Sequence, residues 1–497
     1  MSKFLKILCF ILIFFSFHLG AFGQIIVKND FKVNGDGGGA LQTDPAIAID
    51  SVGKFVVVWT DGRYGNDDIY GQMYNNVGDP IGSNFNVSDD PGSYSQNSPD
   101  VARSPAGSFV VVWQDNRNGN YDIYAQRYNA AGTAQGGNII VENGSANQTS
   151  PSVAMDSLGN FVVVWQDSVY GNWDIFGLRF NSSGAPQGSK FMVNPASTAS
   201  QLTPVVAMEN AGNFVVSWCD YRSGNADIYA QRFYANGTPR GTDFRVNDQL
   251  GQSQLQPGID VDTSGDFVVT WIDYRGGSVF DIYAQRYDSS GGWEGVNFKV
   301  TNENSVMHRD PAVALTPSGE FVINWSNKNV DIYAQKYNSS RVTEDGNFLV
   351  NKSSAAIQKS SDIASTGTFT YFVWKDSLND VSNIYAKVVT WSWSEVGEDQ
   401  KDELLREFSL GQNYPNPFNP QTSISFYLKK SGKISIKVYN ILGQRVRDLV
   451  DSYYQNGEHK ADWDGKDDNG KDVSTGIYFY QIKTENSIQA KKMVLLR

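Results

Sequence analysis

Cysteine and histidine are scarce in this sequence of 497 residues, which contains two cysteines and three histidines. Cys9 lies in the apolar N-terminal stretch, so Cys219 is the only cysteine in the rest of the chain and no intramolecular disulfide can form. Within residues 24–393, His308 is the only histidine. This excludes metal centres built from several histidines and argues against a Ser-His-Asp triad. The sequence therefore predicts no metal site and no cofactor.

Long apolar runs and an excess of basic residues are also missing. The apolar stretch Ile7–Phe17 is shorter than the roughly 20 residues that a transmembrane helix needs, so we expect a protein that does not span the membrane. The formal net charge of -12 argues against nucleic acid or an anionic membrane surface as a partner, because both require a basic footprint.

Residues 1–23 have the features of a signal peptide. Lys3 and Lys6 precede the apolar stretch, and Ala21-Phe22-Gly23 forms a small-x-small cleavage site before Gln24. We therefore expect an exported, soluble protein.

One stretch recurs along most of the chain, and its clearest copy is FVVVWQDNRNGNYDIYAQRYN at residues 109–129. Successive copies are 54, 52, 53, 53, 54 and 49 residues apart, measured between their tryptophans. A fixed period near 50 is typical of propellers and solenoids. The seven copies are marked by Trp59, Trp113, Trp165, Trp218, Trp271, Trp325 and Trp374.

A second repeated element indicates how the array closes. The pattern Phe-x-Val-Asn occurs at residues 31–34, and related segments follow each of the first six copies but not the seventh. Each copy is predicted to form four strands, so the seventh lacks an outer strand unless residues 31–34 supply it beside Ile384–Val389. The sequence predicts an all-β fold: a seven-bladed β-propeller over residues 24–393, closed by an N-terminal strand.

The tail differs in composition from the repeats. Residues 394–408 form an acidic linker, and residues 409–497 form a separate small domain that we expect to be an immunoglobulin-like β-sandwich. Its segments LGQNYPNPFNPQTSISFYL, KVYNILGQRVRDL, WDGKDDNGKDVSTGIYFYQI and KKMVLLR resemble the C-terminal sorting domain of the type IX (Por) secretion system. This pattern is also similar to the immunoglobulin-like domain of flagellar hook-capping proteins.

The resemblance implies export through the type IX machinery to the outside or the outer-membrane surface of a Gram-negative bacterium. It leaves open whether the tail is removed. The repeats resemble seven-bladed propellers in general, which implies a fold and no particular function.

Two repeated polar features are candidate sites. The first is an arginine that follows the Trp-x-Asp of several copies. We interpret it as the partner of that aspartate in a closed loop, with a ring of cation sites as the alternative. The arginines are Arg63, Arg117, Arg222 and Arg275.

The second feature is a polar residue that begins the innermost strand of each copy. We expect these side chains near the mouth of the central channel, on the same face as the arginine loops, where amides suit sugar hydroxyls or peptide backbone. The alternative is that they cap loop backbone groups. The residues are Gln42, Gln96, Gln148, Gln201, Gln254, His308 and Gln358.

These features predict a secreted or surface-displayed propeller that binds a glycan or protein ligand, as an adhesion module does, with no catalytic residue assigned. The alternative is a secreted polysaccharide-degrading enzyme on the same scaffold, because the separation of paired carboxylates cannot be read from a sequence. A structural role in the envelope also stays open.

Overall fold

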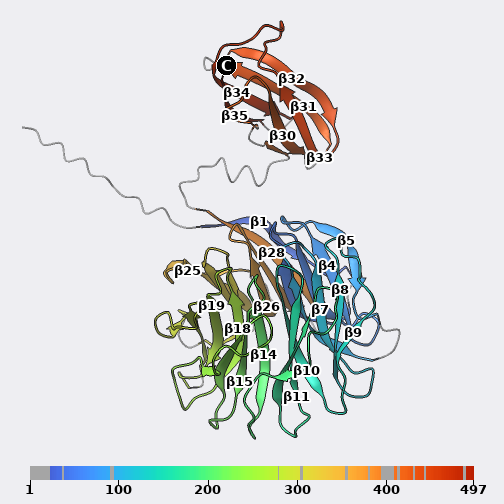
Figure 1. Ribbon diagram of the computed structural model, residues 1–497, viewed down its shortest axis with the longest axis vertical. Coiled ribbons are helices and arrows are strands. Elements are labelled where there is room, and N and C mark those ends of the chain that lie inside the picture. Colours follow the sequence, from blue (N-terminus) through green and yellow to red (C-terminus); the bar gives the residue numbers. More distant parts are fainter. Residues whose placement is uncertain are drawn as a thin grey trace, which may run out of the picture. The chain divides into compact units, whose positions relative to one another are not determined.

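The computed structural model describes residues 23–35, 39–89, 94–277, 279–302, 306–328, 330–352, 356–378, 381–392, 408–410, 413, 415–428, 431–440, 444–484 and 488–496. These residues form β-strands and turns and no helix, which confirms the predicted all-β class. Among them, no helix has the length and apolar character that crossing a membrane requires. The chain divides into two compact units, Met1–Trp393 and Ser394–Arg497 (Figure 1).

The first unit holds, within its described residues, seven antiparallel sheets of four strands each, which we call blades one to seven. From the innermost strand outward they are β2 (Gln42–Ile49), β3 (Phe55–Asp61), β4 (Asp68–Tyr74), β5 (Pro80–Asn86); β6 (Gln96–Arg103), β7 (Phe109–Asp115), β8 (Asp122–Tyr128), β9 (Ile139–Glu142); β10 (Gln148–Met155), β11 (Phe161–Asp167), β12 (Asp174–Phe180), β13 (Phe191–Met192); β14 (Gln201–Met208), β15 (Phe214–Asp220), β16 (Asp227–Phe233), β17 (Phe244–Arg245); β18 (Gln254–Val261), β19 (Phe267–Asp273), β20 (Asp281–Tyr287), β21 (Phe298–Lys299); β22 (His308–Leu315), β23 (Phe321–Asn327), β24 (Asp331–Tyr337), β25 (Thr343–Leu349); and β26 (Ile357–Ser365), β27 (Phe369–Leu378), β28 (Val381–Ser392), β1 (Gly23–Lys32).

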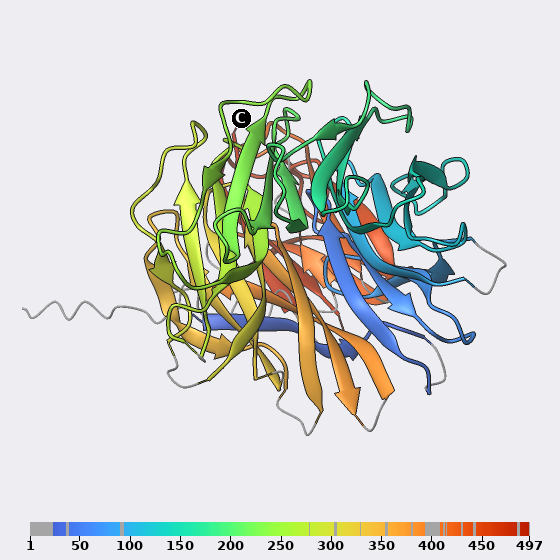
Figure 2. The same ribbon diagram turned by 90° about the horizontal axis from the view of Figure 1, so that it is seen from below.

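The blades form a closed ring. Their innermost strands contact one another in chain order, and β26 of the last blade contacts β2 of the first. Figure 2 shows this order as colours that pass from blue through green and yellow to orange around the ring. Strand β1 completes blade seven, where Phe31 pairs with Ala386 and Lys32 with Tyr385. The predicted closure by an N-terminal strand is therefore confirmed.

The second strand of each blade is the centre of the core. All seven residues of β3 are buried, as the uninterrupted apolar pattern predicts for a strand covered on both faces. Trp113 packs in one apolar cluster with Val56 and Val58 of the preceding blade. The same arrangement recurs around the ring, because every repeat tryptophan is almost completely buried. Packing between blades therefore accounts for the repeated tryptophan.

The strand register assigns the loops to the two ends of the ring. In blade one, Gln42 pairs with Asp61, and Asp61 pairs with Asp68. The loops from the second to the third strand therefore lie at the same end as the loops that lead into the next innermost strand. We call this end the motif face, because it carries both polar features of the repeat.

The second unit is a two-sheet sandwich within its described residues. One sheet has the order β29 (Phe408–Leu410), β30 (Thr422–Leu428), β33 (Gly457–Trp463), and the other has the order β32 (Arg445–Tyr454), β31 (Gly432–Asn440), β34 (Gly476–Lys483), β35 (Ile488–Leu495). Ile424, Trp463, Val438 and Tyr480 contribute to the core that the sheets share. The immunoglobulin-like topology stays a prediction. Residues 1–22 of the predicted signal peptide and residues 394–407 of the predicted linker lie outside the described residues.

Candidate functional site

The four motif arginines are held in the same way. Arg222 Nη2 lies 2.5 Å from the buried Asp220 carboxylate, and its guanidinium lies 4.1 Å from the ring centre of Tyr229. Trp218 donates its indole N–H to the same carboxylate at 2.9 Å. Burial raises the pKa of Asp220, but the hydrogen bonds from Arg222 and Trp218 outweigh it and hold the pKa below its usual value.

The equivalent pairs have the same geometry. Nη2 to Oδ2 distances are 2.6, 2.5 and 2.8 Å for Arg63–Asp61, Arg117–Asp115 and Arg275–Asp273. The interpretation of this motif as a loop closed by an Asp–Arg pair is confirmed. The four arginine side chains remain between 16% and 26% exposed, so part of each stays accessible to solvent.

Blade three lacks the arginine, because Val169 stands in its place. Lys190, which comes from the segment before the outer strand, lies 3.7 Å from Asp167 and 5.1 Å from the ring centre of Phe176. A cation from another loop thus occupies the place of the missing guanidinium. Val169 itself is 48% exposed at the motif face.

The predicted ring of six glutamines and His308 is buried, whereas we expected its side chains near the mouth of the central channel. Each of its seven side chains is at most 1% exposed. Each pairs across strands with the residue two positions after the repeat tryptophan, as Gln201 does with Asp220. The structure therefore brings a glutamine and an Asp–Arg pair together at the motif face of blades one, two, four and five. A ligand contact by these glutamines stays a prediction.

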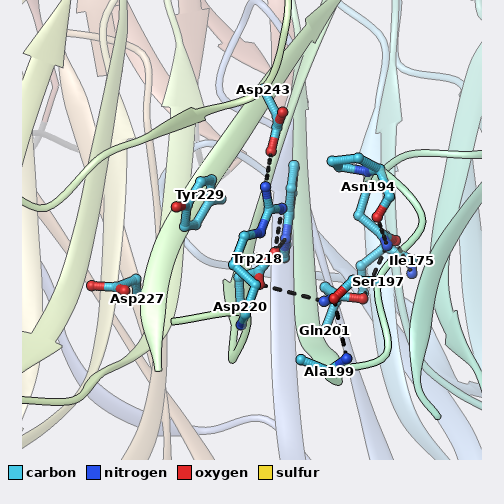
Figure 3. A network of polar contacts seen from close by, with 12 residues as sticks. Ile175, Asn194, Ser197, Ala199, Gln201, Trp218, Asp220, Asp227, Tyr229 and Asp243 are labelled. Atoms are coloured by element: carbon cyan, nitrogen blue, oxygen red, sulfur yellow. Dashed lines mark hydrogen bonds and ion pairs between the residues drawn. The ribbon is translucent and has the colours of Figure 1, made fainter. Parts of the chain in front are cut away.

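The hydrogen bonds of Gln201 show which contacts hold these buried side chains in place (Figure 3). Its Nε2 atom donates to Asp220 at 3.4 Å, and its Oε1 atom accepts from Asn194 at 2.9 Å. Asn194 Oδ1 in turn accepts the backbone N–H of Ile175 at 2.7 Å. The network joins the third strand of blade three, and the segment after its outer strand, to the innermost strand of blade four. Its groups are buried and hydrogen-bonded, which is what buried polar side chains require.

His308 takes the glutamine position of blade six. Its Nδ1 atom lies 3.3 Å from the Asp281 carboxylate, and its ring meets Trp325 edge-on. Hydrogen bonds from His308 and Lys299 hold the pKa of Asp281 below its usual value, although burial by itself raises it. His308 therefore belongs to the same buried polar layer.

A cavity of about 650 Å³ occupies the centre of the ring. This size lies within the range of roughly 300–1,000 Å³ that is common for small-molecule sites. Its lining comes from the innermost strands and includes four aspartates and no lysine, arginine or histidine. The aspartates are Asp44, Asp100, Asp260 and Asp362.

Each innermost strand contains one polar residue with a strained backbone. We call these seven residues the αL ring. Each member has a φ between +50° and +53°, in the left-handed region that non-glycine residues rarely adopt. Five of the seven line the cavity. Each member lies in a β-bulge two residues after the glutamine or histidine position. The members are Asp44, Ser98, Ser150, Thr203, Gln256, Asp310 and Ser360.

Sequence reasoning missed the αL ring, although a signal for it exists. Six of its members immediately precede a proline, and all seven are polar. A residue before proline ordinarily adopts an extended conformation, so the left-handed backbone was not to be expected. Glycine would relieve the strain, yet no copy of the repeat has glycine there.

Three of the cavity aspartates bridge neighbouring blades. Asp260 accepts backbone N–H groups from Val261 at 2.8 Å and from Leu315 of the next blade at 2.7 Å. Asp362 does the same with Ile363 and with Ile47 of blade one, and Asp100 with Val101 and Val153. Burial within the ring raises the pKa of Asp260 and of Asp362 to about 7, despite these hydrogen bonds.

The tail of the chain matches a known family. Residues 412–496 match the family model described as a secretion system C-terminal sorting domain. The second unit is therefore a sorting domain, and it marks the protein for export to the cell surface or the extracellular space. The predicted resemblance of the tail is confirmed.

No curated protein matches the chain in sequence. The chain is similar to a protein of unknown function from Dyadobacter fermentans, with 9% identity over 75% of this chain and 100% of that one and a TM-score of 0.48. It is similar to the polysaccharide lyase Uly1, with 9% identity over 74% and 100% and a TM-score of 0.49. It is also similar to PorZ, a surface component of the type IX secretion system of Porphyromonas gingivalis, with 15% identity over 94% and 60% and a TM-score of 0.40.

Proposed function

We propose that the exported propeller is a binding module, and that its ligand, a glycan or a protein segment, is anchored in the central cavity from the motif face. The αL ring is the observation that carries this proposal. Strained residues persist where the surrounding structure enforces them, and they concentrate at functional sites. Seven polar residues are kept in such a conformation, and five of them line one cavity, which is best explained by a use for the side chains themselves.

The chemistry of the cavity suits a hydroxylated ligand. Ser98, Ser150 and Thr203 offer hydroxyl groups, and the cavity aspartates offer carboxylate oxygens that accept hydrogen bonds from sugar hydroxyls or peptide N–H groups. The motif arginines extend this polar surface outward, because each side chain is partly exposed. In this proposal the buried glutamines and His308 position the loops of the motif face, and the arginines contact the ligand.

Replacing members of the αL ring by glycine tests the proposal. Glycine tolerates a φ near +50°, so the triple variant Ser98→Gly, Ser150→Gly, Thr203→Gly should unfold at the same urea concentration as the wild type or a higher one. If the side chains bind the ligand, the variant should lose binding on a glycan array or a peptide array. The matched control is Arg341→Gly, since Arg341 has a φ of 63° in a turn at the opposite end of the ring. Unchanged binding by the triple variant would contradict the proposal.

A second candidate function is polysaccharide cleavage in the same cavity. It is favoured by Asp260 and Asp362, whose pKa of about 7 is suited to a general acid near neutral pH. A reducing-sugar assay on the glycans that bind best separates the two functions. New reducing ends that disappear in Asp260→Asn or Asp362→Asn would favour the enzyme, whereas binding without turnover supports the binding module.

A further inference from the structure

The outer face of the larger sheet in the sorting domain departs from the usual pattern. An antiparallel sheet of a sandwich presents apolar side chains to the core and polar side chains to solvent. The core face follows this rule with Val438, Tyr480 and Met493. The outer face, however, exposes Ile477 by 42% and Phe479 by 38%.

One row of four side chains crosses all four strands of this face. Arg445 of β32 pairs with Tyr439 of β31, Tyr439 pairs with Phe479 of β34, and Phe479 pairs with Lys492 of β35. Two aromatic residues thus occupy the two central strands, and one cation stands on each edge strand. We call these four residues the outer row.

The surroundings of the outer row are also basic. Lys437 and Lys483 lie on the same face, since they alternate along their strands with core residues. Arg445 contacts Asp448 at 3.1 Å and Asp468 at 3.6 Å, so its charge is partly balanced within the domain. Over residues 409–497 the sequence has 13 lysines and arginines and nine aspartates and glutamates, a net charge of +4. The whole chain has a net charge of -12, so the tail differs in sign from the rest.

An apolar centre with charges at its rim is the usual composition of a protein-binding surface. Aromatic residues and arginine are also the residue types that contribute most to binding at such surfaces. We infer that the outer row is the surface by which the sorting domain docks on a component of the export machinery, and that this component presents an apolar patch flanked by carboxylates. The inference rests on the sorting domain and does not depend on the ligand of the propeller.

Charge reversal at both ends of the outer row tests this inference in the full-length chain. The variant Arg445→Glu, Lys492→Glu would be produced in a Gram-negative host with a type IX secretion system, and the fraction outside the cells measured by immunoblot. Reversed charges at a complementary surface slow association and weaken the complex, so we expect a decrease of about tenfold in the exported fraction. A separate variant, Phe479→Ser, should reduce export in the same way, and Phe479→Tyr should restore it.

The other sheet of the sandwich supplies matched controls. Lys460 and Tyr427 are exposed on that sheet, so Lys460→Glu and Tyr427→Ser repeat the same kinds of change outside the outer row. We expect both controls to be exported like the wild type. Urea unfolding of each purified variant decides whether reduced export reflects folding. The charge-reversed variant changes only exposed side chains, so it should unfold at the same urea concentration as the wild type.

If another molecule binds this face, the experiment gives a different result. Normal export of the charge-reversed variant would overturn the inference, as would equal loss in Lys460→Glu. If the outer row instead binds anionic lipid, the variant should lose flotation with vesicles that contain anionic lipid while its export stays normal. If it binds the acidic propeller of the same chain, the variant should show a larger hydrodynamic radius with normal export.

Discussion

Asn194 donates a hydrogen bond from its side-chain amide to the carboxamide oxygen of Gln201 at 2.9 Å, and both side chains are buried. The same relationship joins Asn247 to Gln254 at 2.9 Å. In each case the donor follows the outer strand of one blade and the acceptor begins the innermost strand of the next. The repeated Asn and Gln therefore join the blades through their side chains, beside the backbone hydrogen bonds that Gln201 and Gln254 donate to Trp173 and Ala226 of the preceding blades.

Replacing Gln201 by leucine should lower the free energy of unfolding. The change removes the buried hydrogen bonds to Asn194 and to the Asp220 carboxylate, and the loss of such bonds costs about 1–3 kcal/mol. Urea denaturation followed by tryptophan fluorescence measures the effect. The control is Gln187→Leu, since Gln187 is exposed in the connection between the last two strands of blade three. Equal unfolding curves for both variants would contradict the structural role.

Replacing Arg222 by methionine should make the protein more sensitive to acid. The folded-state pKa of Asp220 lies below its usual value of 3.8, so this carboxylate stabilises the fold above that pH and loses its contribution as the pH falls through the lowered pKa. Without Arg222 the pKa rises, because burial is then opposed by fewer hydrogen bonds. We expect acid unfolding to begin at a higher pH than in the wild type, whereas Lys54→Met, at an exposed lysine, should unfold at the wild-type pH.

The closed ring could be predicted because the information for it is periodic. The spacing of the tryptophans indicated the number of blades, and the displaced Phe31–Asn34 segment indicated the closing strand. The length of the outer strands was not predictable in the same way. Strand β13 contains only two residues and β25 contains seven, although the asparagine after each strand accepts a backbone N–H in the same way, Asn194 from Ile175 and Asn351 from Ile332.

The candidate site was less predictable, because a β-bulge alters which side chains reach the channel. In blade four the register shifts between Leu202 and Val205, so one extra residue on the innermost strand offsets the alternation of its side chains. Gln201 is therefore buried, and Thr203, two residues later, borders the cavity. A bulge depends on the backbone conformation of one residue, and hydrophobic periodicity carries no information about it.

Replacing Asn324 by valine should stabilise the protein. Asn324 lies on the second strand of blade six and is completely buried, and within the described part of the chain neither its Nδ2 nor its Oδ1 atom has a hydrogen-bond partner. Valine occupies the equivalent position at Val112 and Val164. Removing an unsatisfied buried amide should increase the free energy of unfolding by about 1 kcal/mol, measured by urea denaturation.

Thr270 is the matched control for this change, because it holds the same position in blade five and donates to the backbone oxygen of Tyr283 at 3.0 Å. Thr270→Val removes a satisfied hydrogen bond and should destabilise the protein slightly. A loss of stability in Asn324→Val would mean that its amide is hydrogen-bonded in solution.

The free energy of unfolding of the propeller should fall as the pH rises from about 4 to about 7, because the buried cavity aspartates hold protons in the folded chain over this range. The pKa of Asp260 is about 7 in the folded state against an ordinary value of 3.8, so in this window the folded chain holds a proton that the unfolded chain has released. Protonation therefore stabilises the fold at low pH, and this contribution is lost as the pH rises through 7. Asp260→Asn should flatten the dependence on pH, because its side chain does not titrate.

Urea midpoints of the wild type and of Asp260→Asn, measured across this pH range, test the prediction through the difference between the two curves. The absolute stability of the variant should be lower, since an amide has one oxygen for the two N–H groups of Val261 and Leu315. That offset is the same at every pH and does not affect the slope. Asp79→Asn, at an aspartate whose side chain is 63% exposed, should give a curve parallel to the wild type. Parallel curves for Asp260→Asn and the wild type would show that the channel solvates this carboxylate fully and would remove the basis for a general acid in the cavity.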